Sequence, residues 1–184
     1  MLYLASKSPR RRELLTQIHV EFQCLDIDIP EVRKPGEPPE AFVKRMAVEK
    51  AQAGLRMVQV QNAFVLGADT IVLLDNQIMG KPKDRNDGLA MLSRLSGRKH
   101  KVLSAVALTH ALITSVELSI SEVEFREINA EERELYWDSG EPADKAGAYG
   151  IQGIGAIFIK HLSGSYSGVM GLPLYETGKL LASR

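Results

Sequence analysis

The chain contains the run Leu2-Tyr3-Leu4-Ala5-Ser6-Lys7-Ser8-Pro9-Arg10-Arg11-Arg12-Glu13-Leu14-Leu15. The apolar stretch at its start predicts a strand, and the Ser and Pro that follow predict a tight turn. The apolar residues at helical spacing after them predict a helix that Ser8 caps. Three arginines at the helix start are unfavourable, because the free backbone N–H groups there already carry partial positive charge. A bound anion, held by these amides, by the hydroxyls of Ser6 and Ser8 and by arginine, would resolve this conflict. A phosphate site and a solvated basic turn are therefore the two interpretations of this run.

The composition bounds the class of protein. The 184 residues are 45% hydrophobic and 25% charged, which predicts one globular domain over residues 1–184. Lys plus Arg equals Asp plus Glu at 23 each, so the broad basic surface of a nucleic-acid-binding protein is not expected. The most apolar stretch, residues 63–74, is too short to cross a bilayer and contains Asp69, so membrane insertion is not expected. Cys24 is the only cysteine, and we expect it to fill the core. A single cysteine and the lack of an export-signal pattern in the sequence together favour a cytoplasmic location.

Strands and helices alternate irregularly along the sequence. Apolar periodicity, capping residues and turn residues predict helices from residue 9 and over 40–56, 84–95, 129–136 and 174–181, and strands over 2–5, 20–24, 64–66, 71–74, 77–79, 102–108, 114–125 and 156–160. A change of phase at Val123 and Phe125 predicts a bulge. Because some neighbouring strands are joined by turns too short for a parallel crossover, we expect an α/β fold with a mixed β-sheet flanked by helices.

Several charged residues are not explained by local structure. Lys50 lies at the edge of the inward stripe of the helix over 40–56, either extending to solvent or directing its ammonium into a polar site. Asp69 interrupts a buried strand, so its carboxylate should be paired, metal-bound or directed into a cleft. A buried salt bridge with a purely structural role is the alternative to a functional site. Glu31 lies in a loop rich in Pro, and Lys81 is in a basic turn before Pro82.

This mixture of cations and carboxylates suits a polyphosphate ligand. Cations and amides neutralise phosphate oxygens, whereas carboxylates hold a hard divalent metal such as Mg or Mn and can take a proton from water. Neither a Walker-type loop nor a dinucleotide-binding glycine fingerprint is present in the sequence. No Ser/His/Asp arrangement is favoured, so direct attack by activated water is the simplest mechanism.

The sequence resembles the Maf family. The matching motifs, in order, are Leu4 to Leu15 of the opening run, Glu31, Ala47-Val48-Glu49-Lys50-Ala51, Gly67-Ala68-Asp69-Thr70, Gly80-Lys81-Pro82, the run from Asp144 to Gly153, and Gly171-Leu172-Pro173-Leu174. The resemblance covers nearly the whole chain. It implies an inosine triphosphate pyrophosphatase-like (Maf/Ham1) fold and a nucleoside triphosphate pyrophosphatase that releases a nucleoside monophosphate and pyrophosphate.

The resemblance also implies a role for each matching residue. Asp69 would accept the proton and hold the metal together with Glu31; Ser6, Arg10, Arg11, Lys50 and Lys81 would bind phosphates; Arg11, Thr70 and Gln152 would select the substrate. Arg12 matches a variable position and is expected to be exposed. A divalent metal cofactor and a homodimer are further expectations from the resemblance.

The segment Gly150-Ile151-Gln152-Gly153 resembles the branch of the family that acts on dTTP and UTP. Relatives that prefer 7-methyl-GTP differ in this segment and rank second. The amide of Gln152 offers both a donor and an acceptor, which suit a pyrimidine edge and a guanine edge equally, so the pyrimidine preference rests on the resemblance. A non-catalytic nucleotide-sensing regulator of cell division is the alternative from another class of protein.

Overall fold

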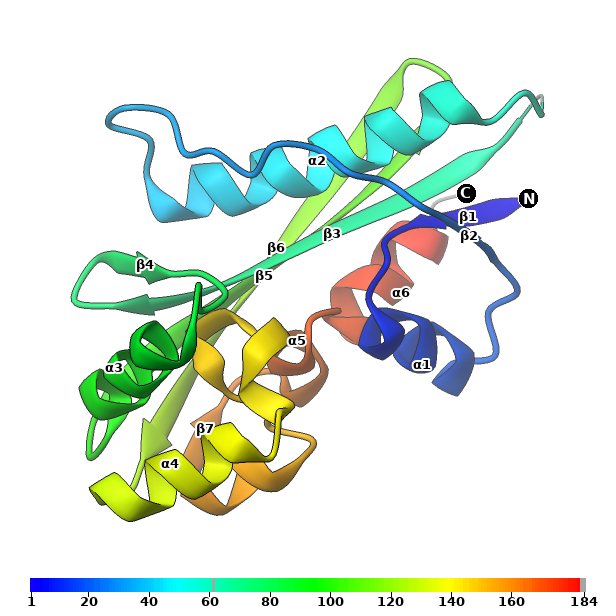
Figure 1. Cartoon of the computed structure of the whole chain (residues 1–184). Coiled ribbons are helices and arrows are strands. Elements are labelled where there is room, and N and C mark those ends of the chain that lie inside the picture. Colours follow the sequence, from blue (N-terminus) through cyan, green and yellow to red (C-terminus); the bar gives the residue numbers. More distant parts are fainter. Residues whose placement is uncertain (61, 183–184) are drawn as a thin grey trace. The chain divides into compact units, whose positions relative to one another are not determined.

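The structure is a computed structural model that describes residues 1–60 and 62–182. Figure 1 shows the path of the chain through strands and helices. The strands are β1 (Leu2–Ala5), β2 (Gln23–Leu25), β3 (Phe64–Leu74), β4 (Gln77–Met79), β5 (Lys99–His110), β6 (Ile113–Phe125) and β7 (Ile159–Ser163). The α-helices are α1 (Pro9–Gln17), α2 (Pro39–Met57), α3 (Arg85–Leu95), α4 (Ala130–Asp138), α5 (Tyr166–Met170) and α6 (Leu174–Ala182). Short 3-10 helices are η1 (Glu141–Asp144), η2 (Ala146–Ala148) and η3 (Ile154–Phe158).

The strands form one mixed sheet in the order β2-β1-β3-β5-β6-β7, with β4 paired to β3. Strand β1 runs parallel to both β2 and β3, whereas the pairs β3–β4 and β6–β7 are antiparallel. The predicted α/β fold with a mixed sheet is therefore confirmed. In the part of the chain that the structure describes, no helix is both long enough and apolar enough to cross a membrane.

The described chain separates into two compact units. Unit 1 comprises Met1–Thr70, Ser104–Ser119 and the segment from Gly171 onward, and unit 2 comprises Ile71–Leu103 and Ile120–Met170. Each unit has an apolar core of its own; in unit 2 it is built around Phe125, Phe158 and Tyr149. The expectation of a single domain over residues 1–184 stays a prediction.

Several local predictions are confirmed by the observed elements. The capping box of α4 is complete, with the Asn129 side chain accepting from the Glu132 N–H and the Glu132 side chain accepting from the Asn129 N–H. The predicted bulge corresponds to a register shift between Glu124 and Phe125. Ser8 occupies the N-cap position of α1, but its side chain makes no capping hydrogen bond. Its N–H instead donates to Ser6 Oγ over 3.1 Å.

Two further local predictions are wrong, besides the capping hydrogen bond of Ser8. The strand expected over 156–160 begins only at Ile159, because the preceding residues form η3, whose first amides donate to the Glu141 carboxylate. Cys24 is exposed rather than a core residue, since it lies in the three-residue strand at one end of the sheet order.

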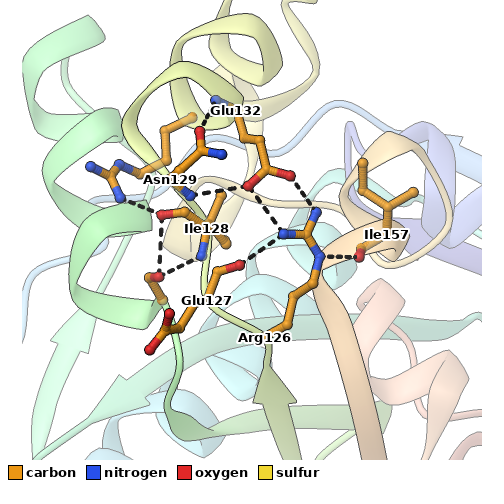
Figure 2. A network of polar contacts seen from close by, with 8 residues as sticks. Arg126, Glu127, Ile128, Asn129, Glu132 and Ile157 are labelled. Carbon is orange, nitrogen blue, oxygen red and sulfur yellow. Dashed lines mark hydrogen bonds and ion pairs between the residues drawn. The ribbon is translucent and has the colours of Figure 1, made fainter.

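An ionic network links the end of β6 to the start of α4 in unit 2 (Figure 2). The Arg126 guanidinium donates to both carboxylate oxygens of Glu132, over 2.6 and 3.1 Å. It also donates to the backbone carbonyls of Glu127 and Ile157 over 2.8 and 3.0 Å. The carboxylate that completes the capping box is thus bound to Arg126, the residue that follows β6.

In unit 1, helix α2 lies directly on the backbone of β3 at Gly67. A Cβ atom at Gly67 would lie 2.3 Å from the Ala47 carbonyl oxygen and 2.5 Å from the Ala51 nitrogen. Both atoms belong to the helix backbone, which cannot move aside as the end of a flexible side chain could. Glycine is therefore required here for a close approach of helix and strand.

Replacing Gly67 by Ala should force α2 away from β3. We expect Gly67→Ala to lower the free energy of unfolding by about 2 kcal/mol, the usual cost of overpacking a core, in urea titrations. Gly178→Ala is the matched control, because no atom lies within 4 Å of a Cβ atom at that position of α6. The control should be neutral or slightly stabilised. Equal stability of Gly67→Ala and the parent would contradict the packing described.

His100 is a buried titratable residue in the core of unit 2. It is 3% exposed, its Nε2 lies 2.8 Å from Tyr149 Oη, and its Nδ1 has no hydrogen-bond partner among the described residues. The ring packs edge-on against Phe125 and Tyr149. Burial lowers the pKa of His100 to about 4, so the imidazole is neutral in the folded protein at neutral pH.

This depressed pKa predicts a loss of stability in acid. Below the unfolded-state pKa of about 6.5, the unfolded chain binds a proton that the folded chain does not bind until about pH 4. The free energy of unfolding should therefore fall by about 3 kcal/mol more between pH 6.5 and 4 than in His100→Gln, which cannot titrate. Urea titrations across this range measure the difference.

Candidate functional site

Two carboxylates and one ammonium meet in unit 1. Lys50 Nζ donates to Asp69 Oδ1 over 2.7 Å and to Glu31 Oε1 over 2.5 Å. Lys50 comes from α2, Asp69 from β3 and Glu31 from the loop before α2. The side chains of Lys50 and Asp69 are 13% and 9% exposed, whereas that of Glu31 is 53% exposed. The structure thus brings together three of the predicted site residues at the border between core and solvent.

The environment of Asp69 favours a carboxylate that can accept a proton. Burial raises the pKa of Asp69, and the opposing attraction of Lys50 and Arg11 does not cancel this effect. A carboxylate with a raised pKa is a stronger base than one in water. A perturbed carboxylate next to a fixed cation is typical of functional sites.

The arginine-rich start of α1 is tied to Ser6 and to the segment that precedes α6. Arg11 Nε donates to the Gly171 carbonyl over 2.8 Å, and Arg11 Nη1 donates to Ser6 Oγ over 3.2 Å. Ser6 Oγ also accepts from Ser8 N–H, so its lone pairs are used and its proton can be donated. Burial lowers the pKa of Arg11, and the negative charges of Asp69 and Glu31 oppose this change. The guanidinium of Arg11 nevertheless stays charged, because the pKa of arginine is very high. Arg10 is half-buried, and Arg12 is exposed as predicted.

Thr70 is held by a residue that the sequence did not single out. Its Oγ1 lies 2.6 Å from Ser104 Oγ, and it also donates to the Gly171 carbonyl over 3.4 Å. Ser104 is 1% exposed in β5. A buried serine in an apolar strand is a signal for such a contact, but the sequence does not identify its partner.

The loop that carries Glu31 is fixed by Arg45 and Glu37, which sequence reasoning also missed. Arg45 of α2 donates to both carboxylate oxygens of Glu37, over 2.6 and 2.7 Å, and to the Val32 carbonyl over 2.9 Å. The hydrogen bond from Arg45 lowers the pKa of Glu37 to about 2. Since Val32 follows Glu31 in the chain, these contacts of Arg45 restrict where the Glu31 carboxylate can lie.

Lys81 and Gln152 belong to unit 2, and both are exposed. Also in unit 2, Lys145 donates to Asp144 Oδ1 over 2.8 Å and to the Glu141 carbonyl over 2.6 Å. The predicted roles of Lys81 and Gln152 toward a substrate stay predictions.

The carboxylates of Glu31 and Asp69 fit a hard divalent cation whose remaining ligands come from other groups. Residues 1–60 and 62–182 contain no group of three or more His, Cys, Asp or Glu side chains that could hold a metal by themselves. Glu31 and Asp69 both accept a hydrogen bond from Lys50 Nζ. Two carboxylates with phosphate oxygens and water are the usual environment of Mg²⁺ at a phosphate site.

Taken together, unit 1 places a basic carboxylate next to cations, a hydroxyl and a helix start that can bind an anion. Such a combination of groups is expected where an enzyme directs water at a phosphate group. The family model described as "Maf-like protein" matches residues 1–184, and the chain belongs to the Maf family.

Curated relatives match almost end to end. The dTTP/UTP pyrophosphatase of Xanthomonas campestris is 54% identical, with 100% of this chain and 98% of that protein covered. The protein of the same name from Saccharophagus degradans is 51% identical over 98% of this chain and 87% of that protein. The one from Aromatoleum aromaticum is 52% identical over 99% and 94%.

Among solved structures, the Ham1 protein of Staphylococcus aureus matches with a TM-score of 0.47 and 15% sequence identity. The match covers 67% of this chain and 71% of that chain.

Removing the ammonium should leave a buried carboxylate without its partner. We expect Lys50→Met to lower the free energy of unfolding at pH 8 by about 3 kcal/mol in urea titrations, the usual cost of breaking a buried ion pair. The loss should shrink as the pH falls, because Asp69 then becomes neutral. Lys44→Met, on the same helix, is the matched control. A loss that does not depend on pH would contradict the pairing with Asp69.

Proposed function

We propose that this chain is a nucleoside triphosphate pyrophosphatase that converts dTTP and UTP, and related or modified pyrimidine nucleotides, to the monophosphate and pyrophosphate. The observation that carries the proposal is the buried Asp69 carboxylate bound to Lys50 beside Glu31. The names of the relatives at about half identity support the reaction and the base preference. A nucleoside triphosphate is the partner that this chemistry requires, and cytoplasmic location and a homodimer stay predictions.

The reaction needs one activated water molecule. Asp69 takes a proton from water, whose oxygen bonds to the α phosphorus while the bond from that phosphorus to the α–β bridging oxygen breaks. The electron pair of that bond leaves with pyrophosphate. Burial, which raises the pKa of Asp69, makes the carboxylate more basic than an exposed one.

The remaining residues of unit 1 would bind and orient the phosphates. Ser6 and the start of α1 supply a hydroxyl and backbone amides, and Arg10, Arg11 and Lys50 supply positive charge that attracts phosphate oxygens. Glu31 and Asp69 would hold Mg²⁺ or Mn²⁺, which would neutralise phosphate charge when bound.

Lys81 is proposed to add a further phosphate contact. Thr70, Arg11 and Gln152 are proposed to select the substrate; Ser104 fixes the Thr70 hydroxyl in this arrangement. A primary amide at Gln152 can pair with the donor and acceptor of a pyrimidine edge.

Replacing Asp69 by Asn should remove the base and leave the fold intact. We expect kcat for dTTP to fall by about 10²- to 10⁴-fold, the usual contribution of general base catalysis. Asp26→Asn, at an exposed carboxylate paired with Lys7, should keep the parental rate. Circular dichroism and thermal melting verify that both variants are folded. A rate for Asp69→Asn equal to that of the parent would show that Asp69 is not the base.

Product analysis separates this proposal from its rivals. The parent is incubated with dTTP, UTP, dCTP or 7-methyl-GTP and with Mg²⁺ or Mn²⁺, and products are resolved by chromatography. Monophosphate and pyrophosphate support the proposal, whereas diphosphate and phosphate would contradict α–β cleavage. Preference for 7-methyl-GTP would overturn the base assignment, and unchanged triphosphate would favour a nucleotide sensor.

A further inference from the structure

A phenol and a carboxylate hold the glycine-rich segment 150–155 at both ends. The Gly150 N–H donates to Tyr136 Oη over 3.0 Å, and Tyr136 Oη donates to Glu141 Oε1 over 2.7 Å. At the other end, the N–H groups of Ile154 and Gly155 donate to the Glu141 carboxylate over 2.8 and 3.1 Å. We call Tyr136 and Glu141 the loop clamp. All these residues belong to unit 2.

The glycines of this segment make room for the clamp. A Cβ atom at Gly153 would lie 2.1 Å from Glu141 Oε2, and one at Gly155 would lie 2.6 Å from Tyr136 Oη. Gly153 has a φ of −119°, which lies outside the left-handed region that favours glycine. Glycine at positions 153 and 155 therefore leaves room for the Glu141 carboxylate and the Tyr136 phenol.

The charges of the clamp suit its role. Burial alone would raise the pKa of Glu141, but the hydrogen bonds from Tyr136, Gly155 and Ile154 and the charge of Lys145 outweigh it and lower this pKa. Burial, and after it the hydrogen bond to Glu141, raises the pKa of Tyr136. At neutral pH the carboxylate is therefore charged and the phenol is protonated, which is the state that these hydrogen bonds need.

Gln152 lies between the two held ends and is exposed. A segment whose ends are fixed loses little entropy when it binds, so a side chain on it is preorganised. We propose that Tyr136 and Glu141 are positioning residues that fix the backbone of Gln152 and thereby set the base preference of the enzyme. This inference rests on the proposed function and on the role proposed for Gln152.

The test compares base preference in clamp variants. Tyr136→Phe and Glu141→Gln are measured with Glu131→Gln, an exposed carboxylate in the first turn of α4, as the matched control. We expect the ratio of kcat/KM for dTTP to that for dCTP to fall about tenfold in both clamp variants, mainly through KM, a loss of about 1.4 kcal/mol of discrimination. The control should keep the parental ratio.

A double variant tests whether the clamp acts through Gln152. Gln152→Ala should lower the same ratio, and adding Tyr136→Phe to it should change the ratio by less than twofold, because both changes remove one function. Hydrogen exchange followed by mass spectrometry should show faster exchange of residues 150–155 in the clamp variants. Faster exchange or a lower melting temperature with an unchanged ratio would mean a purely structural role and would overturn the proposal.

Binding of non-hydrolysable α,β-imido analogues of dTTP and dCTP separates this inference from the proposed function. A parent that binds the dTTP analogue selectively but hydrolyses nothing would refute the proposed function alone. Loss of that selectivity in the clamp variants would then still support the inference. Unchanged selectivity in both clamp variants would overturn it, whether or not the parent is active.

Discussion

The close approach of α2 to β3 at Gly67 is the constraint on which the site depends. Since the backbone atoms of Ala47 and Ala51 occupy the space that a side chain at position 67 would need, the helix can lie on the strand itself. Lys50, one residue before Ala51, then reaches Asp69, two residues after Gly67. The ammonium in turn compensates a carboxylate that would be costly to bury alone. Helix packing and site chemistry therefore depend on the same contact.

The site combines a rigid part with an adjustable part. Asp69 is buried in a central strand, whereas Glu31 is exposed on a loop and reaches the same ammonium. Arg45 and Glu37 fix that loop through a two-point ion pair and a carbonyl contact beside Glu31. Because the Glu31 side chain is exposed, its ion pair contributes little free energy, so this carboxylate can exchange one cation partner for another at small cost. A buried one keeps its position and its raised pKa.

Local patterns predicted the elements and the unusual residues, but not the tertiary pairs. The capping box at Asn129 and Glu132 and the helix around Lys50 could be read from short spacings, and Asp69 was recognised because a charge in an apolar strand needs a partner. The contacts of Ser104 with Thr70 and of Tyr136 with Glu141 depend on where elements pack, which spacing does not encode. The strand expected at 156–160 begins only at Ile159 for this reason, since residues 154–158 form η3, whose first two amides donate to the distant Glu141 carboxylate.

The central claim is that a water molecule activated by Asp69 attacks the α phosphorus. Hydrolysis of dTTP in water enriched in ¹⁸O tests this claim most directly. Mass spectrometry of the products locates the oxygen that came from water. We expect one ¹⁸O atom in dTMP and none in pyrophosphate, with both products formed at the same greatly reduced rate in Asp69→Asn. Label in pyrophosphate would mean attack at the β phosphorus and would contradict the account.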